Sequence, residues 1–193
     1  IMKMEEGLDT GDVLVEKQIK IENKDNLKTL TKKLSDLSSE LILTAISDIE
    51  QNKNRDINLL LKKQTDFQRE LKYARMINKF DYIINWENSS TDIYRKINAL
   101  YPRANSTYKS KNLKIIKIKI LTIDEIQNKN YKILSNVLKP GYIIGLIENL
   151  GIIITTKTDP ILLLEAKLEG KNVSSQNQLI QQLNPVIGEK FSD

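Results

Sequence analysis

The sequence contains neither cysteine nor histidine. Without cysteine, disulfide bonds and thiolate metal sites are excluded. Without histidine, the chain lacks the commonest general base and the commonest metal ligand of proteins. We therefore expect no metal site, and any imidazole used in catalysis would have to come from elsewhere.

Aromatic residues make up only 6% of the sequence, and no stretch of 18 uncharged apolar residues occurs. Because a membrane-spanning helix needs such a stretch, we expect no membrane partner. Apolar residues still form 40% of the 193 residues, which is enough for the core of one large or two small domains. Isoleucine is the main apolar residue, and it favours β structure in the second half.

Charge is unevenly placed along the chain. Residues 1–52 carry 7 lysines and 11 acidic residues, whereas residues 53–193 carry 23 lysines and arginines and 14 acidic residues. An acidic segment joined to a basic one indicates two modules with different partners. The basic module is a candidate for binding a polyanion. A general enrichment in lysine, isoleucine and asparagine is the alternative explanation, and we expect both to contribute.

Two glycines bracket Asp9 in the stretch from Glu6 to Asp12. Glycine accepts backbone conformations that other residues avoid, so another backbone or a ligand can approach closely. Apolar residues flank the stretch, which predicts strand, tight loop and strand, with Val13–Ile21 as the second strand. Loops at the end of a sheet usually carry the sites of α/β proteins. An ordinary hairpin with a polar turn is the alternative.

A helix is predicted next, with Asp25 or Asn26 as its N-cap. Apolar residues at three-to-four-residue spacing predict that this helix is amphipathic and has one buried face: Leu27, Leu30, Leu34, Leu37, Leu41, Ala45 and Ile49. The pattern then fails between Gln51 and Asp66. Polar stretches of this kind are typical of extended, adaptable linkers.

The sequence pattern in the second half of the chain predicts a short helix and several strands. Ser89 or Ser90 can cap the helix, and Pro102 ends it. Leu113–Leu121 alternates as a strand does, with a phase slip at Ile115–Ile116 that indicates a bulge. The remaining predicted elements are strands at 142–147, 152–157 and 161–168 and a closing helix at 174–183. Several short strands predict a small barrel or sandwich, and we expect the lone Trp86 to anchor its packing.

Several segments, at matching intervals, resemble those of one enzyme family, the methionyl-tRNA formyltransferases. The most specific are the first fourteen residues, with Gly7-Leu8-Asp9-Thr10-Gly11, and the block from Trp86 to Pro102. Further matching segments are Tyr73–Arg75, Ile84–Trp86 and Leu168–Lys171. The resemblance covers nearly the whole chain.

The resemblance implies an α+β chain in which residues 1–52 form the C-terminal strands and helix of an α/β formyltransferase catalytic domain. Residues 53–72 would be an interdomain linker, and residues 73–193 an OB-like β-barrel domain that binds tRNA. In the family, an Asn-x-His motif and the loop that holds the folate lie upstream of the position that corresponds to Ile1. We therefore expect this chain alone to be inactive.

Members of this family transfer a formyl group from 10-formyltetrahydrofolate to the methionine of initiator methionyl-tRNA, in translation initiation. The resemblance gives Asp9 the role of orienting a histidine and assisting proton transfer. It implies that Gly7 and Leu8 line the folate pocket. It also implies a monomer in the cytoplasm, or in the stroma or matrix of an organelle. We expect five basic residues to contact tRNA: Arg69, Arg75, Lys79, Lys111 and Lys114.

Two other functions remain open at this point. Residues 69–120 hold 12 lysines and arginines against 4 acidic residues, with aromatic residues between them. This pattern is also typical of a non-catalytic OB-like tRNA-binding module. Leu8-Asp9-Thr10-Gly11 further resembles the aspartic-protease motif. That alternative is disfavoured, because a second Asp-Thr-Gly is absent and a homodimer would be required.

Overall fold

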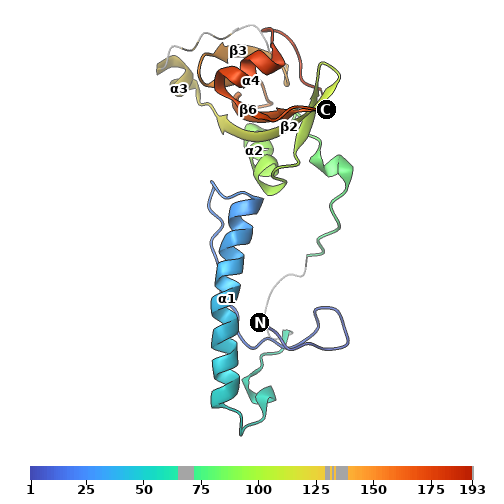
Figure 1. Cartoon of the computed structure of the whole chain (residues 1–193), viewed down its shortest axis with the longest axis vertical. Helices are drawn as coiled ribbons and strands as arrows, with labels where there is room; N and C mark the ends of the chain where they lie inside the picture. Colours follow the sequence, from blue (N-terminus) through green and yellow to red (C-terminus); the bar gives the residue numbers. More distant parts are fainter. Residues whose placement is uncertain (65–71, 129–130, 132, 134–138, 193) are drawn as a thin grey trace. The chain divides into compact units, whose positions relative to one another are not determined.

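The computed structural model describes residues 1–64, 72–128, 131, 133 and 139–192 (Figure 1). The chain forms two compact units, Ile1–Met76 and Ile77–Asp193. The first unit is built around one long helix, and the second around an antiparallel sheet. None of the helices in the described residues combines the length and apolar character that crossing a bilayer requires.

Helix α1 (Leu27–Gln51) begins with a capping box. The side chain of Asn26 accepts the backbone N–H of Thr29 at 3.0 Å, and the hydroxyl of Thr29 accepts the N–H of Asn26 at 2.9 Å. These two bonds satisfy donors that would otherwise be unpaired at a helix start. The predicted N-cap at Asp25 or Asn26 is thus confirmed, with Asn26 as the cap.

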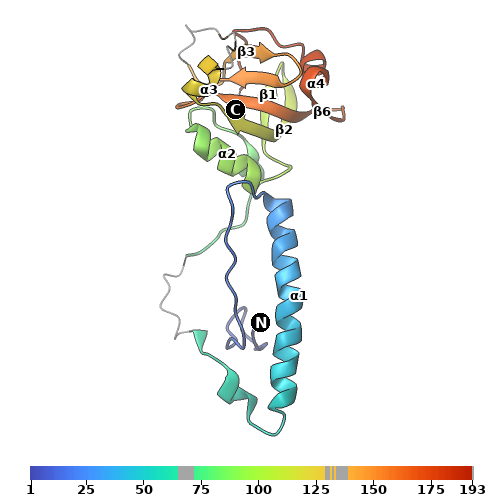
Figure 2. The same cartoon turned by 90° about the vertical axis from the view of Figure 1, so that its left-hand side faces the viewer.

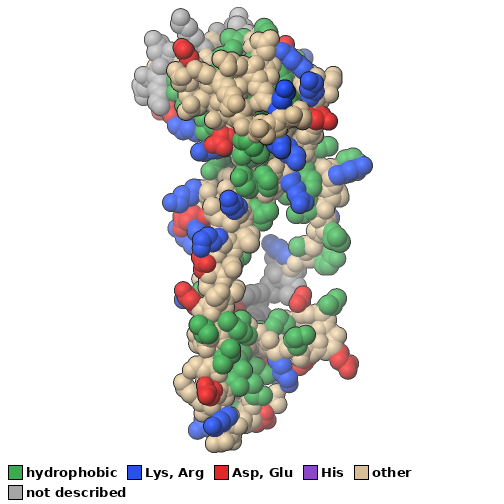
Figure 3. Space-filling model, in the orientation of Figure 1, with side chains coloured by type: hydrophobic (Ala, Val, Ile, Leu, Met, Phe, Trp, Pro, Cys, Tyr) green, Lys and Arg blue, Asp and Glu red, His purple; other side chains and the backbone are tan. Residues whose placement is uncertain are grey.

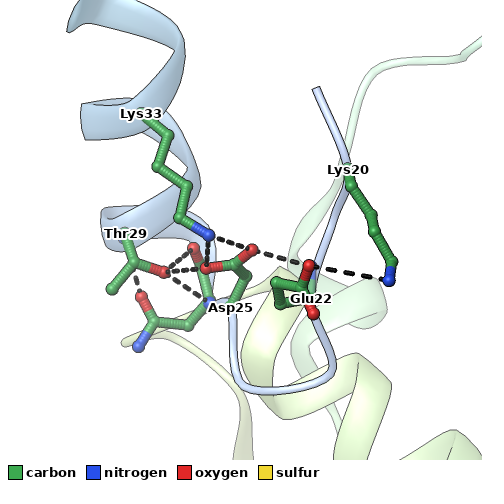
Figure 4. A network of polar contacts seen from close by, with 6 residues as sticks. Lys20, Glu22, Asp25, Thr29 and Lys33 are labelled. Atoms are coloured by element: carbon green, nitrogen blue, oxygen red, sulfur yellow. Dashed lines mark hydrogen bonds and ion pairs between the residues drawn. The ribbon is translucent and has the colours of Figure 1, made fainter. Parts of the chain in front are cut away.

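Asp25 ties the preceding turn to the helix (Figure 4). Its buried carboxylate accepts the ammonium of Lys33 at 2.7 Å and the backbone N–H of Glu22 at 2.8 Å. The hydroxyl of Thr29 also donates to it at 3.2 Å. The ammonium of Lys33 and the N–H of Glu22 hold the pKa of Asp25 below its usual value. The carboxylate therefore stays charged and fixes the start of the helix.

Two expectations about the first unit are wrong. Residues 15–21 form no strand, and only Val13 makes isolated bridges, to Met2 and Lys62. Alternation alone does not make a strand, because the backbone also needs a neighbouring strand to pair with. The described residues supply no such neighbour, and residues 13–22 instead run alongside α1, where Lys17 lies 3.9 Å from Glu40 (Figure 2).

The apolar stripe of α1 is not the buried face that its spacing predicted. Ala45 is its one buried residue, while Leu34 is 44% and Ile49 41% exposed. Figure 3 shows hydrophobic side chains on the surface along this helix. Spacing reports which side chains share a face, but burial requires a second surface against that face. The described part of this unit covers the stripe only in part.

Residues 57–62 belong to the first unit. They comprise the 3₁₀ helix η1 (Ile57–Leu60) and Lys62, whose backbone exchanges two hydrogen bonds of 2.8 Å with Val13. The contact-based division between the units lies after Met76. The assignment of residues 53–72 as an interdomain linker remains a prediction.

The described residues of the second unit form six antiparallel strands in the order β1-β2-β5-β4-β3, with β6 paired to β5. Their bounds are β1 Asn105–Tyr108, β2 Lys111–Ile120, β3 Ile143–Ile147, β4 Gly151–Ile154, β5 Ile161–Leu168 and β6 Val173–Ser175. The bulge predicted at Ile115–Ile116 is confirmed, because the register of β2 shifts between Ile115 and Lys117; a second shift, between Lys117 and Ile118, was not predicted. The strands at 113–121, 142–147, 152–157 and 161–168 are confirmed in outline as β2 to β5, while β1 and β6 were not anticipated.

In the part of this unit that the structure describes, three α-helices and one 3₁₀ helix accompany the sheet. Their bounds are η3 Lys79–Tyr82, α2 Ser90–Ala99, α3 Ile123–Asn128 and α4 Gln176–Leu183. Ser89 caps α2 by accepting the N–H of Asp92, as predicted. Helix α2 packs against β2, and α4 packs against β4, β5 and β6.

The last residues of the chain connect the two outer strands β1 and β3. Thr107 of β1 and Ser192 exchange two backbone hydrogen bonds of 2.9 Å. On the other side, the N–H of Ile143 donates to the carbonyl of Glu189 at 2.9 Å, and that of Phe191 to Gly141 at 2.8 Å. Residues 189–192 therefore continue the hydrogen bonding from β3 back to β1, which the sequence pattern did not indicate.

The main core of this unit lies inside that ring of strands. Trp86 is 1% exposed, as predicted for a packing anchor, and its indole N–H donates to the hydroxyl of Ser106 at 3.0 Å. The ring of Phe191 lies 5.6 Å from Trp86 and 4.6 Å from Tyr108 between centroids. A second cluster includes Ile153, whose neighbours in β4 belong to the main core. Alternation along β4 thus buries both of its faces.

The hydroxyl of Tyr108 donates to the carboxylate of Glu189, which also accepts the N–H of Val186 at 3.0 Å and lies 3.3 Å from the ammonium of Lys109. These groups lower the pKa of Glu189, the Tyr108 hydroxyl most of all. Burial and the carboxylate raise the pKa of Tyr108, so the phenol remains a donor. The pair anchors the C-terminal segment to β1.

We predict that Tyr108→Phe lowers the free energy of unfolding by about 1 kcal/mol at pH 7, since it removes one hydrogen bond to a charged, partly exposed group. A lowered pKa stabilises the fold fully above the unfolded value, near 4.5, and this stabilisation is lost as pH falls through the lower folded value. The difference between variant and parent should therefore shrink in acid. Denaturant unfolding at several pH values measures it.

Tyr142→Phe is the matched control, because its hydroxyl makes no hydrogen bond to a described residue. It should change stability little at any pH. Equal effects of the two substitutions, or a Tyr108→Phe effect that persists unchanged in acid, would contradict the assigned bond.

Candidate functional site

The loop Gly7–Asp12 is held by hydrogen bonds at its base and from a distant segment. The N–H of Lys3 donates to the carbonyl of Asp12 at 2.9 Å, beside the Met2–Val13 bridge. The side-chain amide of Gln64 donates to the carbonyls of Asp9 and Gly11, at 2.7 Å each. Gln64 is separated from Asp9 by 55 positions in the sequence and from Gly11 by 53, so these bonds join two distant segments. The backbone of the loop is fixed from two directions.

The local conformation explains two residue choices in this loop. A side chain at Gly11 would place its first carbon 1.7 Å from the carbonyl oxygen of Lys3, so only glycine permits this close approach. Asp9 has φ 54°, in the left-handed region that aspartate enters more easily than most residues. At Gly7 the nearest atoms belong to the side chain of Thr10, so a larger residue there would require that side chain to move.

Asp9 presents a free carboxylate. The residue is exposed, and its side-chain oxygens make no hydrogen bond or ion pair with any described residue. Gly7 and Leu8 are exposed beside it, and Leu8 is 96% exposed. A charged acceptor on a fixed backbone can orient a donor brought by another segment. Within the described residues, no cluster of three acidic side chains could hold a metal ion.

The predicted tRNA contacts are divided between the units. Arg69 lies outside the described residues. Arg75, in the first unit, is exposed and donates to the carbonyl of Met76 at 3.0 Å. In the second unit, the ammonium of Lys79 lies 5.3 Å from the centroid of the Phe80 ring, and Lys111 and Lys114 are exposed on β2. The structure thus brings Lys111 and Lys114 onto one strand.

Strand pairing adds a basic residue that the sequence reasoning missed. Lys167 of β5 lies directly opposite Lys114 of β2, although 53 positions separate them in the sequence. Other lysines of β2 are already neutralised, since Lys117 lies 3.5 Å from Glu165 and Lys119 pairs with Glu125. Lys167 can be identified as a neighbour of Lys114 only once the register of β2 and β5 is known.

Comparison with known proteins connects this fold to one family. The sequence profile described as "Formyl transferase, C-terminal domain" matches residues 76–184. A methionyl-tRNA formyltransferase of Prochlorococcus marinus subsp. pastoris is 91% identical over the whole of this chain, and that of Prochlorococcus marinus strain MIT 9515 is 82% identical. In both comparisons the chain spans 59% of the relative's own length.

Among solved structures, HypX from Aquifex aeolicus in complex with tetrahydrofolic acid has a TM-score of 0.64 to this chain. The match covers 98% of this chain and 30% of HypX, at 14% sequence identity, so it concerns the fold. The family profile, by contrast, matches more than half of the 193 residues directly. The chain therefore belongs to the formyl transferase C-terminal domain family.

Proposed function

We propose that this chain is part of a methionyl-tRNA formyltransferase, which transfers a formyl group from 10-formyltetrahydrofolate to the methionine of initiator tRNA in translation initiation. The observation that carries the proposal is the 91% identity to such an enzyme over every residue of the chain. The fixed Gly7–Asp12 loop with its free carboxylate agrees with it. The family match disfavours the aspartic-protease alternative.

In the proposed reaction the methionine amine attacks the formyl carbon, and the bond from that carbon to the folate nitrogen breaks. The amine loses a proton, and the folate nitrogen gains one. Asp9 would orient a histidine supplied by the part of the enzyme that this chain does not span, and so assist the proton transfer. Gly7 and Leu8, exposed beside it, would line the folate pocket.

The exposed stripe of α1 supports the view that residues 1–52 are a portion of a larger catalytic domain. Three residues of the stripe, Leu27, Leu34 and Ile49, are between 41% and 51% exposed, and three other large apolar side chains of the helix, Ile42, Leu43 and Ile46, are between 42% and 69% exposed. Contiguous exposed apolar surface usually marks a contact with another surface. We propose that the remaining length of the enzyme covers this stripe.

For the second unit we propose the OB-like barrel that the resemblance implied, within residues 73–193. The C-terminal segment supports this proposal, because it joins β3 to β1 and leaves a closed ring of hydrogen-bonded segments. Barrels of this class bind nucleic acid through basic and aromatic side chains on their surface. We further propose that the enzyme acts as a monomer in the cytoplasm, with residues 53–72 as its interdomain linker.

We predict that Asp9→Asn lowers formylation of methionyl-tRNA at least about 100-fold, the low end for general acid–base catalysis. The test joins this chain to the part of the 91% identical relative that it does not span. The amide keeps the size of the side chain but removes the charge that would hold the imidazole. Turnover with 10-formyltetrahydrofolate measures the effect.

Asp12→Asn is the control, because Asp12 lies in the same loop but has no proposed role in proton transfer. This substitution should lower turnover much less than Asp9→Asn does. The 193-residue chain alone should give background rates. Near-normal turnover of Asp9→Asn together with loss of activity in Asp12→Asn would show that Asp12, not Asp9, is the catalytic carboxylate.

We also predict that the chain binds tRNA with a strong dependence on salt, because each neutralised phosphate releases counterions. Reversing the charges of Arg69, Arg75 and Lys79 together should weaken binding and flatten the salt slope. Titration of fluorescent initiator tRNA at several salt concentrations measures both quantities. Tight binding at high salt, or binding unchanged by the three reversals, would refute this interface.

A further inference from the structure

A row of side chains crosses the outer face of β1, β2, β5 and β6. In this row Asn105 pairs with Lys114, Lys114 with Lys167, and Lys167 with Val173. Directly opposite residues of antiparallel strands place their first side-chain carbons about 5 Å apart. The register therefore holds two lysines side by side, far closer than their sequence positions suggest.

This arrangement is unfavourable for the protein by itself. Both lysines are exposed, and neither makes a hydrogen bond or ion pair with a described residue. Like charges placed directly opposite in a sheet lower its stability. The neighbouring row is the reverse case, because Lys117 faces Glu165 in the register and forms an ion pair with it.

Two carboxylates close to Lys167 in the sequence are already engaged. Glu165 lies two residues before Lys167 and hence on the same face of β5, and Glu169 follows in the turn after the strand. Glu165 is paired with Lys117, and Glu169 accepts the backbone N–H of Asn112 at 3.1 Å. Among the described residues, the two ammonium groups thus have no acidic partner, because both of these acids are already engaged.

The chemistry of the pair fits one phosphate group. Each ammonium has three donors and a full positive charge, and a phosphate diester offers unesterified oxygens that can accept from both at once. A further phosphate on either side would approach Glu165 or Glu169. The surface therefore suits a single backbone phosphate and not a continuous track.

We propose that Lys114 and Lys167 together bind one backbone phosphate of RNA, an inference that rests on the proposed tRNA binding by this chain. Bound phosphate would relieve the repulsion between the two lysines. The pair is then a defined contact point on the β2–β5 surface, in which Lys167 is as important as Lys114.

The test compares Lys114→Gln/Lys167→Gln with the parent 193-residue chain, using fluorescent initiator tRNA over a range of salt concentrations. Loss of one phosphate contact should weaken binding about fivefold near 0.15 M salt and reduce the salt slope by about 0.7–0.9. Thermal unfolding should show equal or higher stability of the variant, because the repulsion is gone.

Lys139→Gln/Lys157→Gln is the matched control. It removes the same charge from two exposed lysines outside the row, and the ammonium group of neither pairs with a described residue. If both double variants weaken binding equally, or if the Lys114/Lys167 variant binds as the parent does, the shared phosphate site is refuted while tRNA binding stands. A loss of stability together with binding would refute it as well. Absence of salt-dependent binding by the parent would refute both proposals.

Discussion

The second unit depends on the contacts of four residues at the end of the chain, 189–192. Their backbone supplies the hydrogen bonds that the outer strands β1 and β3 would otherwise lack, and unpaired strand edges are a liability for any sheet. Phe191 is fully buried between Trp86 and Tyr108, while the carbonyl of Ser192 accepts the hydroxyl of Ser106 at 2.6 Å. The same short segment therefore completes both the sheet and the core.

The two units use their polar groups differently. In the first unit, hydrogen bonds from Lys3 and Gln64 fix a loop in which the Asp9 carboxylate has no partner among the described residues, and helix α1 exposes apolar side chains. Exposed apolar surface of this kind usually marks a contact with another surface. In the second unit the core is closed, and the sheet serves as a rigid support for lysines whose spacing the register sets.

Local patterns predicted those elements whose cause is local. Serine caps, alternation and a phase slip are properties of neighbouring residues, so α2, β2 and the bulge between Ile115 and Lys117 could be predicted from the sequence. Strand β1 escaped notice because Asn105–Tyr108 is polar, and its pairing is set by β2. Val13–Ile21 is the opposite case. Its alternation predicted a strand, but none forms, because a strand also needs a neighbouring strand to pair with.

The residues of the candidate sites also differ in whether local sequence could predict them. Asp9 could be identified because a short motif with two glycines carries the resemblance, and the structure explains Gly11 by its contact with Lys3. Lys167 could not be identified, because nothing near it in the sequence distinguishes it from other surface lysines. Its position opposite Lys114 follows only from the pairing of β2 with β5.

The most direct test of the role of the C-terminal segment is denaturant unfolding of Phe191→Ala. Removing a fully buried aromatic ring typically costs about 3–5 kcal/mol, and we expect a loss of that size here. Val186→Ala, at a side chain that is 57% exposed a few residues earlier, should cost less than about 0.5 kcal/mol. If Phe191→Ala unfolded at the same denaturant concentration as Val186→Ala, the segment would not be what holds this unit together.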